Sequence, residues 1–173
     1  MNKYSLITAV AIAVIVGSIG FGIWGMYSVE QLQFRTEKTP FRYFEFASSE
    51  KIRVCNPTPF FVSFSGVSFD IYYLDDLKGT FTINSNILNP NSSEILAADF
   101  SSESFSEAQY LFMHMDGEFS GDVPVRLDPN QMQIIINYDT KIIGIIPYKQ
   151  TITHSAFEFS QMMNKETSCK SLD

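Results

Sequence analysis

The sequence has few of the residues on which most catalytic and metal sites depend. Its 173 residues include two histidines and two cysteines, and no His-x-His, Cys-x-x-Cys or His-Glu-x-x-His spacing occurs. It also contains no glycine-rich phosphate loop and no Gly-x-Ser-x-Gly motif. His114 falls off the apolar stripe of a predicted helix, and His154 alternates with apolar strand residues. We therefore expect no catalytic residue, no bound metal and no cofactor.

Runs of basic residues are lacking as well. The chain carries 19 Asp and Glu residues against 12 Lys and Arg residues, for a net charge of −7. The electrostatic footprint of a nucleic-acid-binding protein is thus missing, and the acidic excess indicates a soluble surface. We expect no nucleic-acid partner and identify no small-molecule substrate. Asp75-Asp76 and Asp116-Gly117-Glu118 lack the spacing of a calcium loop, so we interpret them as solvated turns.

Charged residues are absent from Ser5 to Tyr27. A helix needs about 20 apolar residues to cross the hydrocarbon of a membrane, and aromatic residues favour its two interfaces. We therefore predict a transmembrane helix at 5–27 in the cell membrane, with the N-terminus cytoplasmic and the C-terminal domain extracytoplasmic. A cleaved signal peptide is the alternative, but Phe21, Trp24 and Met26 fit a small-x-small cleavage site poorly.

After this segment the pattern is mostly that of strands. Residues 28–40 form a polar juxtamembrane stalk that ends in a proline, and residues 161–173 form a polar C-terminal tail. Between them, residues 41–160 alternate apolar and polar positions and are interrupted by turn-forming residues. We predict a mainly β domain here, an antiparallel β-sandwich of about seven strands resembling immunoglobulin or fibronectin-III domains. The last predicted strands cover 123–127, 132–138 and 142–154.

Two local features interrupt the alternation. The apolar set changes phase at Ser65-Gly66, which predicts a β-bulge at Gly66. From Ser104 to Asp116 the apolar residues recur at helical spacing instead, which predicts one amphipathic helix. Ser104 and Glu107 match the capping-box pattern at its start, and Gly117 suits a left-handed cap at its end.

The stretch Cys55-Asn56-Pro57-Thr58-Pro59 is interpreted as the connection between two strands. Pro57 and Pro59 have no amide hydrogen to donate, so they mark the end of a strand. Asn56 can form hydrogen bonds within its own turn. Cys55 and Cys169 are compatible with one disulfide in an oxidising exterior, and two free thiols remain the alternative.

Asn91-Ser92-Ser93 matches the acceptor pattern for N-glycosylation. It lies in an apparent loop of a domain that we expect outside the cytoplasm. Because such triplets arise often by chance, Asn91 is only a possible glycosylation site.

Several of these features together resemble the late-embryogenesis-abundant type 2 family, also called the water-stress and hypersensitive-response (WHy) domain. They are Asn56-Pro57 after a strand, the long strand Pro59–Tyr73, a Gly-Thr-Phe start to the next strand at Gly79, and two closing strands at 136–152. The resemblance covers residues 51–160. It implies an antiparallel β-sandwich with one helix, often carried on one N-terminal membrane helix, and a non-catalytic role in stress protection.

The sequence thus predicts a single-pass, membrane-anchored extracytoplasmic domain that is not an enzyme. Its expected role is binding, protection or scaffolding at the cell envelope. The main alternative is an accessory subunit of a larger membrane complex, in which other membrane or envelope proteins are the partners. An envelope enzyme or metal carrier is the least favoured hypothesis, because the residue patterns of such sites are missing.

Overall fold

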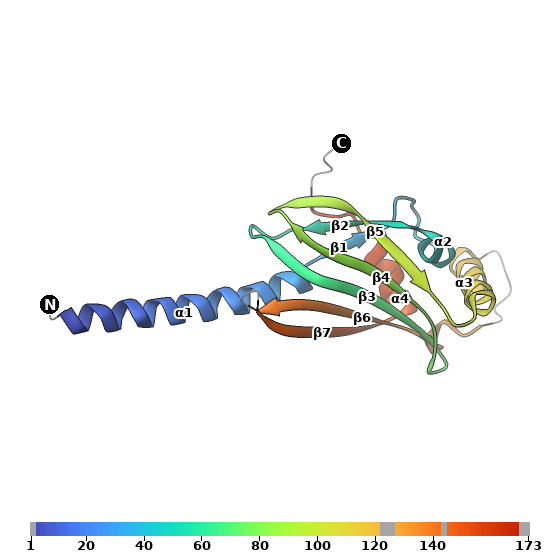
Figure 1. The fold of residues 1–173 in the computed structure, drawn as a ribbon. Coiled ribbons are helices and arrows are strands. Elements are labelled where there is room, and N and C mark those ends of the chain that lie inside the picture. The colour runs from blue at the N-terminus through green and yellow to red at the C-terminus, as the bar shows by residue number, and fades with distance from the viewer. Residues whose placement is uncertain (1–2, 122–126, 143–144, 170–173) are drawn as a thin grey trace.

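A computed structural model describes residues 3–121, 127–142 and 145–169 of the chain (Figure 1). The strands are β1 (Gln33–Arg35), β2 (Lys51–Asn56), β3 (Val62–Tyr73), β4 (Asp76–Leu88), β5 (Ser92–Ser101), β6 (Met132–Ile142) and β7 (Ile146–Ser155). The helices are α1 (Lys3–Glu30), α2 (Tyr43–Ser48), α3 (Phe105–Ser120) and α4 (Ala156–Asn164), with a short 3-10 helix at Pro129–Gln131.

The seven strands form one continuous sheet with the order β1-β2-β5-β4-β3-β6-β7, and every pairing in it is antiparallel. Strand β5 makes the sheet continuous, because residues 92–97 pair with β2 and residues 98–101 pair with β4. The prediction of a mainly β, antiparallel domain is confirmed. The predicted sandwich of two packed sheets is replaced by a single sheet that curls around its own core (Figure 1).

Aromatic side chains fill the space inside this curl. Phe69 of β3 and Phe81 of β4 point inward and are fully buried. Phe46 of α2 packs on Phe81 with 4.1 Å between ring centroids, and Phe159 of α4 packs on Phe69 at 5.8 Å. Tilted and edge-to-face pairs of this kind stabilise a core beyond the area that they bury. The core also includes residues before position 41, among them Phe34 of β1, which packs edge-on against Phe69.

Among the described side chains of helix α1, those near its C-terminal end are the ones buried against the sheet. Ser28 and Val29 are buried, and the helix contacts β3 and β6, whereas residues 4–17 are exposed. The N-terminal part extends away from the sheet (Figure 1). Among the described residues, no helix has the length and apolarity that crossing a membrane requires. The predicted transmembrane helix at 5–27, and with it the single-pass membrane anchor, is therefore without support.

Helix α3 contains the predicted amphipathic helix but is longer. Its buried residues are Ala108, Leu111, Phe112 and Met115. The left-handed cap is Gly121, with φ of 76°, and not Gly117, because the helix continues for another turn. Ser104 is the N-terminal cap residue, but its side chain makes no capping hydrogen bond.

The predicted bulge at Gly66 is misplaced. The register between β3 and β4 is the same on both sides of Gly66, and the shift falls between Ile71 and Tyr72, next to the hairpin turn. Leu74 and Asp75 form that turn with positive φ angles of 53° and 67°. The predicted strand at 123–127 falls outside the described residues, except for its last position.

Candidate binding edge of the sheet

The two edges of the sheet differ in length. Strand β1 has three residues, and Gln33 Oε1 accepts hydrogen bonds from the backbone amide and the hydroxyl of Ser168, at 2.8 and 3.0 Å. The C-terminal segment therefore lies against the face of the sheet that carries the Gln33 and Cys55 side chains. Strand β7 has ten residues, and in the described part of the chain no strand pairs with its outer side. A long edge of this kind presents unpaired backbone groups to which another strand can add.

The inner side of β7 is paired along its whole length. The ladder with β6 runs from Gln133↔Ser155 to Ile142↔Ile146 without a register shift. Pro147 lacks an amide hydrogen and Lys149 is exposed, two features that discourage uncontrolled pairing at the start of a strand. The stretch 150–155 carries neither feature. It is therefore the part of the edge that is available to a partner strand.

A hydrogen-bonded network of side chains connects β7 to the centre of the sheet. Thr151 Oγ1 donates to Asn137 Oδ1 at 2.9 Å, and Asn137 Nδ2 donates to Asp70 Oδ2 at 2.7 Å and to Ser68 Oγ at 3.2 Å. Thr80 Oγ1 donates to the other oxygen of Asp70 at 2.9 Å. These bonds link β7, β6, β3 and β4 in turn. They hold the edge strand in place against the centre of the sheet.

The two histidines lie on different elements. His154 is half-buried in β7, opposite Ile134 of β6. His114 is on α3, where its ring lies 4.2 Å from that of Tyr110, measured between centroids. Cys55 of β2 forms a disulfide with Cys169, with 5.8 Å between the Cα atoms, so neither sulfur is a free nucleophile.

Asn56 anchors the connection between β2 and β3. Its side chain is fully buried, and Nδ2 donates to the carbonyl oxygens of Phe60 at 2.7 Å and Asn89 at 2.9 Å. Its Oδ1 accepts from the amide and the hydroxyl of Thr58, at 3.0 and 2.7 Å. One residue therefore joins the β2–β3 connection, which contains Pro57 and Pro59, to the turn between β4 and β5.

Gly79 lies on β4, and Asn91 lies in the turn between β4 and β5. A Cβ atom on Gly79 would come within 2.3 Å of the ring of Phe100, so the glycine makes room for that ring. Asn91 is exposed in the turn between the two strands, with a positive φ of 50°, and its amide donates to the carbonyl oxygen of Thr58 at 3.0 Å. Glycosylation of Asn91 stays a prediction.

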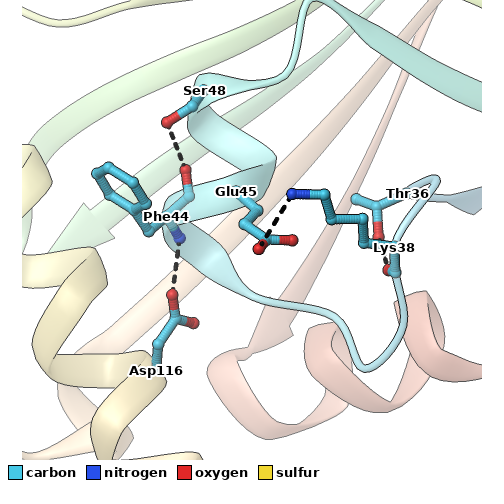
Figure 2. A network of polar contacts seen from close by, with 6 residues as sticks. All are labelled: Thr36, Lys38, Phe44, Glu45, Ser48 and Asp116. Carbon is cyan, nitrogen blue, oxygen red and sulfur yellow. Dashed lines mark hydrogen bonds and ion pairs between the residues drawn. The ribbon is translucent and has the colours of Figure 1, made fainter.

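Asp116, which we interpreted from the sequence as part of a solvated turn, is a structural side chain in the fold. It lies on α3, and its two carboxylate oxygens accept from the amides of Tyr43, at 2.6 Å, and Phe44, at 2.9 Å. Figure 2 shows the bond to Phe44. Burial raises the pKa of Asp116, although these two hydrogen bonds act in the opposite direction. Its position in the sequence could have indicated this role, because Asp116 follows the buried Phe112 by one helical turn and so lies on the same face of the helix. Its carboxylate is engaged in fixing α2 to α3.

The family model described as pili assembly chaperone PapD, C-terminal domain, matches residues 28–116, more than half of the chain. The comparison with curated proteins found no match. The family match overturns the resemblance to the late-embryogenesis-abundant type 2 (WHy) family, and with it the expectation of stress protection. Asn56-Pro57 carried that resemblance, but an Asn-Pro pair after a strand follows from general turn chemistry and occurs in unrelated β domains.

Proposed function

The chain belongs to the family of the pili assembly chaperone PapD, C-terminal domain, and on this premise we propose that it binds an extended segment of another protein subunit along the outer edge of β7. The observation that carries this proposal is the ten-residue edge strand, whose outer side pairs with no strand of the described residues and which is tied to the sheet by the network through Thr151 and Asn137. Addition of a strand gives affinity through backbone hydrogen bonds and needs no catalytic group.

The side chains of β7 define the kind of segment that fits. Ile152 packs against the core from the inner face of the strand, whereas Thr151 and Thr153 face outward on the polar side of the sheet. A partner strand would therefore place apolar residues beside Ile152 and polar residues beside the two threonines. Lys149 favours an acidic residue near the end of the segment that reaches the start of β7.

The proposed location is an extracytoplasmic compartment. Disulfides form and persist in oxidising surroundings and are rare where thiols are kept reduced. The bond between Cys55 and Cys169 supports this location. Alkylation of free thiols in intact cells, followed by reduction and a second alkylation with a heavier reagent, tests it. Labelling of both cysteines in the first step contradicts an extracytoplasmic location.

Hydrogen–deuterium exchange on the full chain tests the binding edge directly. The probes are synthetic ten-residue peptides with alternating apolar and threonine residues, together with scrambled peptides of the same composition. We expect the alternating peptides to slow amide exchange in β7 and to leave exchange in β2 unchanged. Slowing that is absent from β7, or equal slowing by scrambled peptides, contradicts strand addition.

Two threonine variants form a matched pair for the same experiment. Thr153 and Thr82 are both exposed, but Thr153 is on the edge strand and Thr82 is on β4, in the interior of the sheet. Thr153→Lys places a second charged side chain on the edge and is expected to weaken peptide binding. Thr82→Lys leaves the edge intact and is expected to bind peptide as the unaltered chain does. Equal weakening by both variants would indicate a charge effect unrelated to the edge.

A further inference from the structure

A polar pocket lies where β1, β2, β5 and the C-terminal segment meet. Its volume is about 360 Å³, and it is far from the outer edge of β7 in the order of strands. The residues of its wall that bear on a ligand are Arg35, Arg53, Ser93, Thr39, Thr167 and Glu37. We refer to it as the basic pocket, since these two arginines outnumber the one carboxylate, in a chain whose net charge is −7.

The two arginines stand directly opposite each other. Arg35 of β1 pairs with Arg53 of β2 in the register of the sheet, so both side chains leave the same face. Like charges in this position repel and destabilise a strand pair. Both residues are half-buried, and within the described part of the chain neither guanidinium takes part in an ion pair. An anion held between them would convert this repulsion into two charge-assisted interactions.

Ser93 supplies an independent observation. The residue is 8% exposed, and its buried Oγ has no hydrogen-bond partner among the described residues. A buried hydroxyl without a partner is unfavourable, and such groups are rare in folded proteins. Because Ser93 belongs to the wall of the basic pocket, a ligand oxygen seated there would satisfy it.

The number of donors defines the ligand. Each guanidinium presents a fork of N–H groups, and the hydroxyls of Ser93, Thr39 and Thr167 add three more donors. A carboxylate has two oxygens and would leave several of these donors unused, whereas a tetrahedral oxyanion offers an acceptor in each direction. Glu37 adds one negative charge to the wall and lowers the affinity without cancelling the two positive ones. We propose that the basic pocket binds a tetrahedral oxyanion, as free phosphate or as the phosphoryl group of a larger ligand.

The disulfide completes this site. Cys169 is part of the wall, and its bond to Cys55 fixes the segment that carries Thr167 over β2. Breaking that bond frees one side of the pocket and removes a donor. Binding of the oxyanion therefore depends on the oxidised state of the protein.

Calorimetric titration of the full chain with inorganic phosphate tests the proposal, with glycerol phosphate and acetate as parallel probes. We expect saturable phosphate binding that weakens about tenfold or more in Arg53→Gln, because a hydrogen bond to a charged group is lost. Arg42→Gln removes the same charge from an exposed position outside the pocket and is expected to leave the affinity unchanged. Cys169→Ser is expected to weaken binding while the far-ultraviolet circular dichroism spectrum stays the same.

The probes separate the possible ligands. Tighter binding of glycerol phosphate assigns the pocket to a phosphoryl group on a larger molecule, and tighter binding of inorganic phosphate assigns it to the free ion. Acetate binding as tight as phosphate binding overturns the tetrahedral assignment. Equal weakening in Arg42→Gln and Arg53→Gln overturns the site itself, because it shows attraction by general charge alone. Unchanged affinity in Cys169→Ser overturns the part assigned to the C-terminal segment.

Discussion

The buried side-chain amide of Asn56 forms hydrogen bonds with several other residues, so the stability of the fold should depend on it. Its side chain serves the carbonyl groups of Phe60 and Asn89 and both donors of Thr58. Asn56→Ala would leave several buried polar groups without partners, and we expect it to lower the free energy of unfolding by about 3 kcal/mol. Urea denaturation followed by fluorescence measures the change. Asn84→Ala, at an exposed position on β4, is the control and should stay within about 0.5 kcal/mol of the unaltered chain.

The shifted pKa of Asp116 should make the stability of the fold depend on pH. Burial raises its pKa above the ordinary value of 3.8, so the folded chain keeps this proton to a higher pH than the unfolded chain does. The contribution of this ionisation to stability is therefore complete below pH 3.8 and declines as pH rises through the folded pKa. We expect the stability of the unaltered chain, relative to Asp116→Asn, to fall as the pH is raised from below 3.8 towards neutrality.

Denaturation of the unaltered chain and of Asp116→Asn across this pH range measures the difference in their stability. The difference is the useful quantity, because other groups also make stability depend on pH. Hydrogen bonds hold the pKa of Asp128 and the pKa of Glu158 below their ordinary values, so these two groups make stability rise with pH. Both groups are present in the variant as well, and their effect cancels. A relative stability that rises with pH would show that the two amide hydrogen bonds outweigh burial at Asp116.

At the scale of elements, the sequence pattern predicted the elements that have a clear period. Alternation of apolar residues indicated β3, β4 and β6, and the three- and four-residue spacing around Phe112 indicated α3. Helix α4 was missed, because its nine residues follow β7 without a break and were assigned to the end of the β domain and to the polar tail. Its signal was Ser155-x-x-Glu158, the same capping pattern that was assigned to Ser104 and Glu107.

Of the two capping patterns, the one at Ser155 forms its hydrogen bonds and the one at Ser104 does not. Ser155 Oγ accepts from the amide of Glu158 at 3.3 Å, and the carboxylate of Glu158 accepts from the amide of Ser155 at 2.8 Å. Ser104 makes no such bond with its side chain. We expect Ser155→Ala to lower the midpoint of thermal unfolding, at a cost of about 1 kcal/mol, and Ser104→Ala to have little effect. A larger loss in Ser104→Ala would contradict the assignment of the caps.

At the scale of the whole molecule, the single curled sheet depends on pairings that no local pattern reveals. Strand β5 pairs with β2 through one half and with β4 through the other. Strand β3 pairs with β6, although β4, β5 and α3 lie between them in the sequence. Periodicity predicts that a segment is a strand, but it does not select the partner of that strand. For the same reason the outer edge of β7 could not be located from the sequence, although Thr151 and Ile152 were recognised as strand residues. The polar tail gave no sign that it packs against β1 and β2.

The disulfide fixes the C-terminal segment to strand β2, so its removal should lower the stability of the fold. Cys55 and Cys169 are separated by 114 positions, so their bond closes a loop that includes β3 to β7. Such a bond restricts the unfolded chain, and its removal costs about 2–4 kcal/mol. We expect Cys169→Ser to lower the free energy of unfolding by about this amount, while dithiothreitol destabilises only the unaltered chain. If dithiothreitol destabilises both proteins, reduction of the disulfide is not the cause of its effect. If Cys169→Ser leaves the free energy of unfolding unchanged, the C-terminal segment stabilises the fold without the disulfide.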